Sequence, residues 1–173
     1  MNERMFHVFD IKSNKYINNL GVKGQGPNEF LHPFSLIHHS SIDFVSYDLL
    51  DNSLKKIRID SLMMGTIFYE KMISFNSISN SMVIPTKYNN YVGFGLYDSN
   101  MFKLIDSDGQ DIGLFMDFPT DKEKKKIDHR NIALGYQGSL AINPDRDKLV
   151  YASLYGTILG IYSIKEKSIK SFY

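Results

Sequence analysis

The amino-acid sequence predicts an all-β protein, a partial β-propeller built of four-stranded antiparallel blades, with one short helix in an insertion. Short runs rich in Val, Ile, Tyr and Phe fill most of the 173 residues, and each run has the length of a strand rather than of a helix. Asp, Asn, Ser and Gly, which favour tight turns, stand between the runs. Pairs of runs recur about every 40–50 residues, which is typical of propeller blades.

Six strands follow directly from the apolar runs, and short polar connectors join them in pairs. Connectors such as residues 48–53 and 98–100 contain Asp, Asn and Ser, so we expect adjacent antiparallel hairpins. The predicted strands span residues 42–47, 54–59, 91–96, 101–106, 148–153 and 158–164.

A repeated strand end sets the blade boundaries. An apolar residue followed by a polar turn residue ends a strand at four places, spaced 50, 46 and 57 residues apart, and a further strand follows each. These places are Phe9-Asp10, Ile59-Asp60, Ile105-Asp106 and Tyr162-Ser163. Residues 1–173 are therefore predicted to form a single incomplete propeller domain. It contains a half blade at 5–20 and blades at about 35–75, 81–118 and 139–173.

An insertion at residues 119–136 explains the longer spacing before the last blade. Within it, Thr120-Asp121-Lys122-Glu123 has the pattern of a capping box, so we expect a short helix near residues 121–132. The Lys-rich run at 122–126 is interpreted as the solvated face of that helix.

The predicted number of blades leaves open strand edges at the two ends of the domain. About three and a half blades do not close a ring, and exposed edges of this kind recruit partners. We expect either self-association, centred on residues 5–20 or 158–173, or blades supplied by missing sequence or by another polypeptide. Light scattering by the purified chain tests the first expectation.

Composition argues against several classes of function. The 20 Lys and Arg residues balance 19 Asp and Glu residues, and this formal net charge of +1 is not that of a nucleic-acid-binding surface. Cysteine is absent, which excludes disulfides, thiol catalysis and thiolate metal sites within this chain. The N-terminal residues carry no apolar core typical of a signal peptide, and no window is apolar enough to span a membrane.

Two stretches carry a family resemblance. Residues 21–30, GVKGQGPNEF, directly follow a predicted strand, and residues 136–152 read YQGSLAINPDRDKLVYA. Both are similar to stretches of the TolB-like six-bladed β-propeller proteins of Bacteroidetes. The resemblance implies a periplasmic or cell-envelope location, and it supplies no catalytic residues. Members of this family are about twice as long as this chain and usually follow a secretion or lipoprotein signal.

Five residues are candidates for ligand binding. Glu29 lies in the first stretch, where the alternative is that it bonds the backbone of its own loop. The glycines beside it do not form a phosphate-binding loop, because no Gly-Lys-Ser/Thr ending and no helix follow. The others lie in the inserted loop, a position that often forms the binding face of repeat proteins, although a solvated loop is the alternative. They are His129, Arg130, Tyr136 and Gln137.

No catalytic, metal or cofactor site is predicted. A catalytic triad with Asp128-His129-Arg130 would need a nucleophile, and no G-x-S-x-G motif occurs anywhere in the chain. His38 and His39 are adjacent on a strand and point to opposite faces, and no carboxylate stands at ligand spacing from them or from His32.

Together these observations favour a non-enzymatic binding or scaffold module of the bacterial envelope, with a protein, peptide or glycan as ligand. One alternative is a hydrolase- or lyase-type propeller enzyme whose axial site is completed by missing blades. A third possibility is a shortened chain without independent activity.

Overall fold

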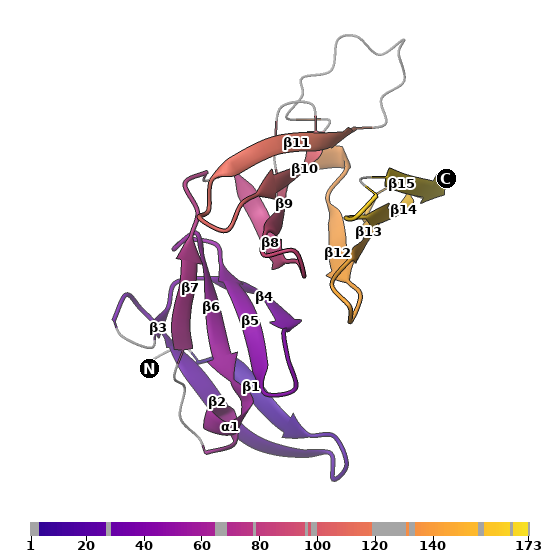
Figure 1. The fold of residues 1–173 in the computed structure, drawn as a ribbon. Helices are drawn as coiled ribbons and strands as arrows, with labels where there is room; N and C mark the ends of the chain where they lie inside the picture. The colour runs from indigo at the N-terminus through magenta and orange to yellow at the C-terminus, as the bar shows by residue number, and fades with distance from the viewer. Residues whose placement is uncertain are drawn as a thin grey trace. The chain divides into compact units, whose positions relative to one another are not determined.

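A computed structural model describes residues 4–26, 29–64, 69–77, 79–95, 97, 100–118, 131, 134–155, 158–166 and 168–172. The described residues form two compact units, Met1–Ile78 and Ser79–Tyr173. Each unit contains two β-sheets (Figure 1). The assignment of residues 1–173 to one propeller domain stays a prediction.

The first unit contains a three-stranded and a four-stranded sheet. The three-stranded sheet consists of β1 (Arg4–Asp10), β2 (Lys15–Lys23) and β3 (Glu29–Phe30). The four-stranded sheet is a consecutive antiparallel meander of β4 (Pro33–His38), β5 (Asp43–Asp48), β6 (Ser53–Arg58) and β7 (Tyr69–Ser74).

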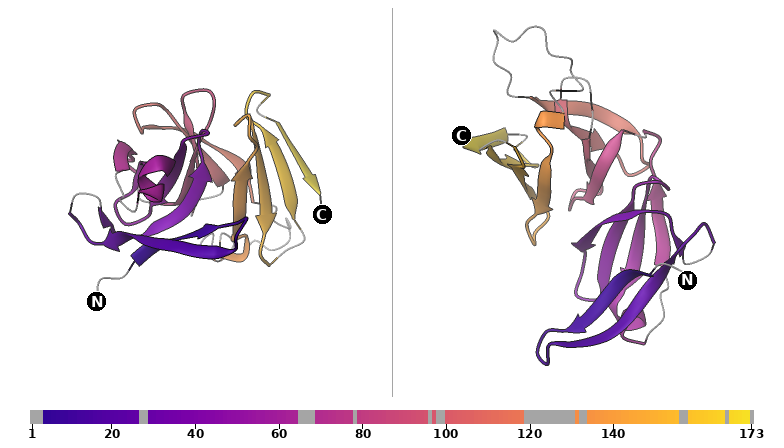
Figure 2. Two further views of the ribbon diagram at one scale, coloured as in Figure 1. Left: turned by 90° about the horizontal axis from the view of Figure 1, so that it is seen from below. Right: turned by 180° about the vertical axis from the view of Figure 1, so that it is seen from behind.

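The second unit contains two antiparallel four-stranded sheets. The first is formed by β8 (Asn80–Pro85), β9 (Tyr91–Gly95), β10 (Asn100–Ile105) and β11 (Asp111–Asp117). The second, orange to yellow in Figure 2, is formed by β12 (Gly138–Ile142), β13 (Lys148–Ser153), β14 (Leu159–Ser163) and β15 (Ser168–Phe172).

The predicted fold class is confirmed, and the six strands predicted from apolar runs begin and end within one residue of β5, β6, β9, β10, β13 and β14. The reason is local, since each strand is an apolar run whose ends carry turn residues. Asn52 and Asn89 adopt positive φ angles in two of these turns, a conformation that asparagine tolerates better than most residues.

Two elements differ from the prediction. The half blade at 5–20 gains a third strand, β3, which pairs in parallel with β2 because the loop after β2 folds back on it. The strand predicted to end at residue 59 stops at Arg58, and α1 (Ile59–Met63) begins there. Asp60 accepts the backbone N–H of Ser61, and the Ser61 hydroxyl donates to the carbonyl of Arg58, so these side chains bond the backbone where the strand ends. The helix predicted near 121–132 falls, apart from Asn131, outside the described residues.

Aromatic side chains join the two sheets of the second unit. The Tyr151 ring lies 5.5 Å from the Phe94 ring and 5.9 Å from the Phe102 ring, and the rings of Phe115 and Tyr162 are 4.6 Å apart. Side chains alternate between the two faces of a strand, so Tyr151 faces the β8–β11 sheet while its neighbours on β13 face away. The Tyr- and Phe-rich strands of this unit therefore pack sheet against sheet.

The opposite face of the β12–β15 sheet is less covered. Leu159 and Ile161 of β14 are 42% and 37% exposed, and they pair with Ala152 and Val150 on β13. An apolar sheet face of this kind is suited to contact with another sheet. Self-association of the chain stays a prediction. Leu159 and Ile161 lie within residues 158–173, one of the two regions on which it was predicted to centre.

Candidate functional site

The Glu29 side chain closes the loop between β2 and β3. Its Oε2 accepts the N–H of Gly26 at 2.7 Å, and the N–H of Gly24 donates to the carbonyl of Phe30 at 3.1 Å. A Cβ atom added at Gly24 would lie 2.0 Å from Oε2 of Glu29, so a side chain at residue 24 would displace this carboxylate from its present place. The prediction that Glu29 bonds the backbone of its own loop is confirmed, and a ligand role for Glu29 stays a prediction.

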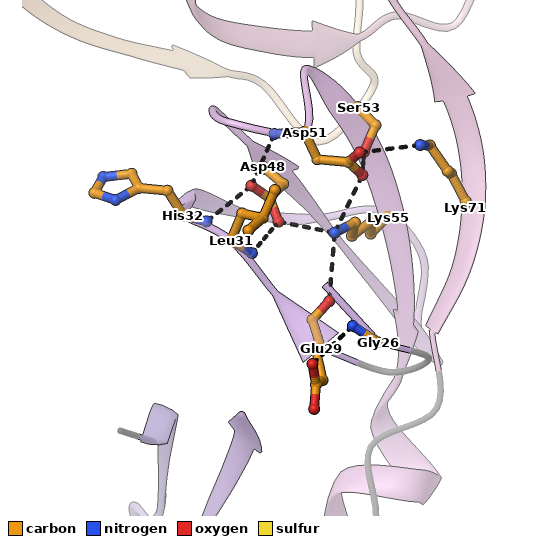
Figure 3. A network of polar contacts seen from close by, with 9 residues as sticks. All are labelled: Gly26, Glu29, Leu31, His32, Asp48, Asp51, Ser53, Lys55 and Lys71. Atoms are coloured by element: carbon orange, nitrogen blue, oxygen red, sulfur yellow. Dashed lines mark hydrogen bonds and ion pairs between the residues drawn. The ribbon is translucent and has the colours of Figure 1, made fainter. Parts of the chain in front are cut away.

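A buried lysine lies behind this loop (Figure 3). Lys55 of β6 is 2% exposed, and its Nζ lies 2.8 Å from Oδ2 of Asp48, 3.3 Å from Oδ2 of Asp51 and 3.5 Å from the carbonyl oxygen of Glu29. The rings of Phe30 and Tyr69 lie 5.1 Å and 4.9 Å from the same nitrogen. Carboxylates and ring faces therefore surround the ammonium group and compensate for its lost hydration.

Asp48 ties the loop to the four-stranded sheet. Its carboxylate is fully buried and accepts the backbone N–H groups of Leu31 at 2.9 Å and of His32 at 2.8 Å, in addition to the bond from Lys55. Charge-assisted hydrogen bonds of this kind are stronger than those between neutral groups. The pair of Asp48 and Lys55, which we call the Asp48–Lys55 pair, therefore positions residues 29–32 against the turn between β5 and β6.

Both members of the Asp48–Lys55 pair are charged at neutral pH. Burial by itself raises the pKa of Asp48, but the hydrogen bonds from Lys55, His32 and Leu31 outweigh burial and hold this pKa below its ordinary value. Burial likewise lowers the pKa of Lys55, but the bond to the Asp48 carboxylate outweighs it and raises this pKa.

The stability of the chain should therefore fall in acid. Below the ordinary Asp pKa of 3.8, the unfolded chain binds a proton at Asp48 before the folded chain does. The free energy of unfolding should decrease as pH falls from 3.8 through the lower pKa of the folded state. Urea unfolding across this range measures the slope, which should be shallower in Asp48→Asn than in the natural sequence. Equal slopes for the two proteins would contradict this assignment.

Residues 136–152, the second stretch with a family resemblance, contain a closed turn and a close contact between two strands. Oδ1 of Asn143 accepts the N–H groups of Asp147 at 3.0 Å and of Lys148 at 2.8 Å, which closes the turn between β12 and β13. A Cβ atom at Gly138 would lie 2.2 Å from the carbonyl oxygen of Ala152, so the two strands approach too closely for a side chain there.

An exposed surface lies beside this stretch. Gln137 is exposed, and its carbonyl accepts the N–H of Leu154 at 2.7 Å, which joins the segment before β12 to the connection after β13. Leu154 and Tyr155 are 66% and 77% exposed. We call these three residues, together with exposed Leu134, the 134–155 surface.

The five ligand-binding candidates from the sequence do not lie together in one described site. Tyr136 and Gln137 lie together in the second unit, where the half-buried Tyr136 ring packs 5.5 Å from Phe118 and its carbonyl accepts the Tyr151 hydroxyl. Glu29 belongs to the first unit, and His129 and Arg130 lie outside the described residues. Sequence reasoning missed Leu154 and Tyr155, whose only signal is an apolar pair directly after a strand.

A family model matches residues 1–173, with the description TolB-like 6-blade propeller-like. The chain belongs to the TolB-like 6-blade propeller-like family. Membership confirms the family that the sequence predicted. In this TolB-like chain, residues 21–30 hold Gly24 and Gly26, where a Cβ would meet the Glu29 carboxylate, and residues 136–152 hold Gly138, where a Cβ would meet the Ala152 carbonyl. Glu29 and Asn143 each bond the backbone of their own loop or turn.

Solved structures share the fold of this TolB-like chain. One is the extracellular domain of a proposed one-component system from B. thetaiotaomicron, with 13% identity, a TM-score of 0.53, and coverage of 96% of this chain and 21% of that chain. Another is a member of the duf4221 family from Bacteroides vulgatus, with 14% identity, a TM-score of 0.54, and coverage of 96% and 50%. This chain thus spans about one fifth and one half of their lengths. A comparison with curated protein sequences finds no match.

Among the residues that the structure describes, no three or more His, Cys, Asp or Glu side chains gather as metal ligands would. His32 stacks on Phe34, with ring centroids 6.4 Å apart, and His38 lies 5.9 Å from Phe44, so both imidazoles contact aromatic rings. That the TolB-like chain binds no metal or cofactor stays a prediction. No helix in the described segments has the length and apolar character needed to cross a membrane.

Proposed function

We propose that this TolB-like chain is a non-enzymatic binding module of the bacterial envelope, and that its second unit binds a protein or peptide at the 134–155 surface. The observation that carries the proposal is the exposure of Leu154 and Tyr155, at 66% and 77%. Large apolar side chains exposed side by side are typical of interaction sites, and tyrosine is enriched among the residues that dominate binding energy.

The backbone beneath these side chains is fixed. The bond from the Leu154 N–H to the Gln137 carbonyl and the bond from the Ser153 N–H to the Ile158 carbonyl hold both ends of the connection. A backbone segment that is already held in place loses less conformational entropy on binding than a mobile one. An apolar leucine beside the tyrosine favours a protein or peptide over a glycan, which needs polar partners for its hydroxyl groups.

An envelope location is part of the same proposal. It is supported by the family to which the chain belongs and by the similar fold of the extracellular domain from B. thetaiotaomicron. No contact among the described residues specifically favours the alternative of a hydrolase or lyase.

Selection from a phage-displayed library of random peptides tests the binding surface. We expect peptides that bind the natural sequence and lose at least about tenfold in affinity with Tyr155→Ser, because tenfold corresponds to about 1.4 kcal/mol and tyrosine anchors commonly contribute more. The control is Tyr88→Ser, which removes a 39% exposed tyrosine elsewhere in the same unit and should leave affinity unchanged. Peptides that respond equally to both variants, or a selection that yields none, would refute the proposal.

A further inference from the structure

A cavity of about 280 Å³ lies in the second unit, on the sheet formed by β8–β11. None of the residues around it belongs to the 134–155 surface. Its lining combines two charged side chains, two hydroxyl-bearing side chains and an apolar strand segment, namely Ser79, Tyr97, Lys103, Asp111, Ile112 and Leu114 together with Gly113.

The pairing of β10 with β11 brings the charged groups together. The register shifts between Leu104 and Ile105, so that Asp111 at the start of β11 lies opposite Ile105, on the same face of the sheet as Lys103 two residues earlier. Nζ of Lys103 lies 2.7 Å from Oδ2 of Asp111 and 4.5 Å from the centre of the Tyr97 ring. The Tyr97 hydroxyl donates to Oδ1 of the buried Asn80, which holds the ring in place.

The two charged groups differ in access. The Lys103 side chain is 7% exposed, whereas the Asp111 side chain is 45% exposed. The carboxylate can therefore accept hydrogen bonds from a ligand, and the ammonium group beside it neutralises its charge. An anion placed here would be repelled by Asp111, and a cation would be repelled by Lys103. A neutral molecule with several hydroxyl groups can donate to Asp111 and accept from Lys103 or Ser79.

The size and the remaining wall agree with this chemistry. Small-molecule sites commonly occupy about 300–1,000 Å³, so a volume of about 280 Å³, just below this range, suits a single ring rather than a long chain. Ile112 and Leu114 on the edge strand β11 offer apolar surface to the C–H groups of such a ring. We propose that this cavity binds one neutral sugar unit, with Asp111 as the principal acceptor. This proposal is independent of the 134–155 surface.

Titration calorimetry of the purified chain with glucose, galactose, mannose and N-acetylglucosamine tests the proposal. We expect at least one of these sugars to bind in the millimolar range, which is typical of a single small ring. Asp111→Asn should weaken that binding at least about tenfold, because hydrogen bonds to a charged acceptor are the stronger ones. Asp117→Asn, near the other end of β11, should leave the binding unchanged.

A second variant covers the case in which Asp111→Asn disturbs the Lys103 site. Leu114→Trp adds bulk at a 44% exposed position in the cavity wall, so it should exclude the sugar without disrupting the core. Circular dichroism establishes that each variant is folded. Sugar affinities that none of the variants changes would overturn the proposal. Absence of binding by all four sugars, or binding of acetate or methylammonium in their place, would overturn it as well.

Discussion

Replacement of Asp48 by Ala should lower the free energy of unfolding by about 3–5 kcal/mol, because it leaves the buried Lys55 ammonium without its principal counter-charge. The N–H groups of Leu31 and His32 lose their acceptor at the same time. Urea unfolding measured by circular dichroism gives the difference. A loss of this size is a large fraction of the stability of an ordinary domain, roughly 5–15 kcal/mol.

A neighbouring lysine provides the matched control for Asp48→Ala. Lys71 bonds Asp51 at 3.2 Å, but its side chain is 45% exposed, so water replaces the interaction when the side chain is removed. Lys71→Ala should therefore change the free energy of unfolding by at most about 1 kcal/mol. If Asp48→Ala destabilised the chain no more than Lys71→Ala, the Asp48–Lys55 pair would not hold the loop as described.

Replacement of Gly138 by Ala should be nearly as damaging, with a loss of about 3 kcal/mol, at the upper end for an overpacked site. The added Cβ would lie 2.2 Å from the Ala152 carbonyl oxygen and 2.6 Å from the Tyr151 ring. The carbonyl is part of the β12–β13 ladder and cannot move without breaking the pairing of Gly138 with Ser153 and of Ser139 with Ala152. Thermal unfolding measures the loss as a lower midpoint.

Gly135, three residues earlier, is the control for Gly138→Ala. A Cβ at Gly135 would meet no atom within 4 Å, and its φ angle is not positive. Gly135→Ala should therefore be neutral, or stabilising by up to about 1 kcal/mol, because alanine restricts the unfolded chain. Equal losses for the two variants would show that β12 and β13 do not approach as closely as described.

The candidate residues show where sequence reasoning stops. The apolar runs that predict β5 and β6 do not distinguish Asp48 and Lys55 from polar residues on a solvated face, yet both are buried. Their burial depends on Phe30 and Glu29, which are 25 or more positions from Lys55 along the chain. Leu154 and Tyr155 present the reverse case, because an apolar pair after a strand looks like core and is exposed.

Strand positions, hairpins and blade rhythm were determined by the sequence alone, because each depends on a few neighbouring residues. A short run of β-branched and aromatic residues makes a strand, and residues such as Asn52, Asn89 and Gly109 tolerate the turn beside it. The tertiary structure decided the parallel strand β3, the Asp48–Lys55 pair, the exposed Tyr155 and the cavity beside Lys103. Each of these depends on which distant segments meet and how much water they exclude, and no local pattern of residues encodes that.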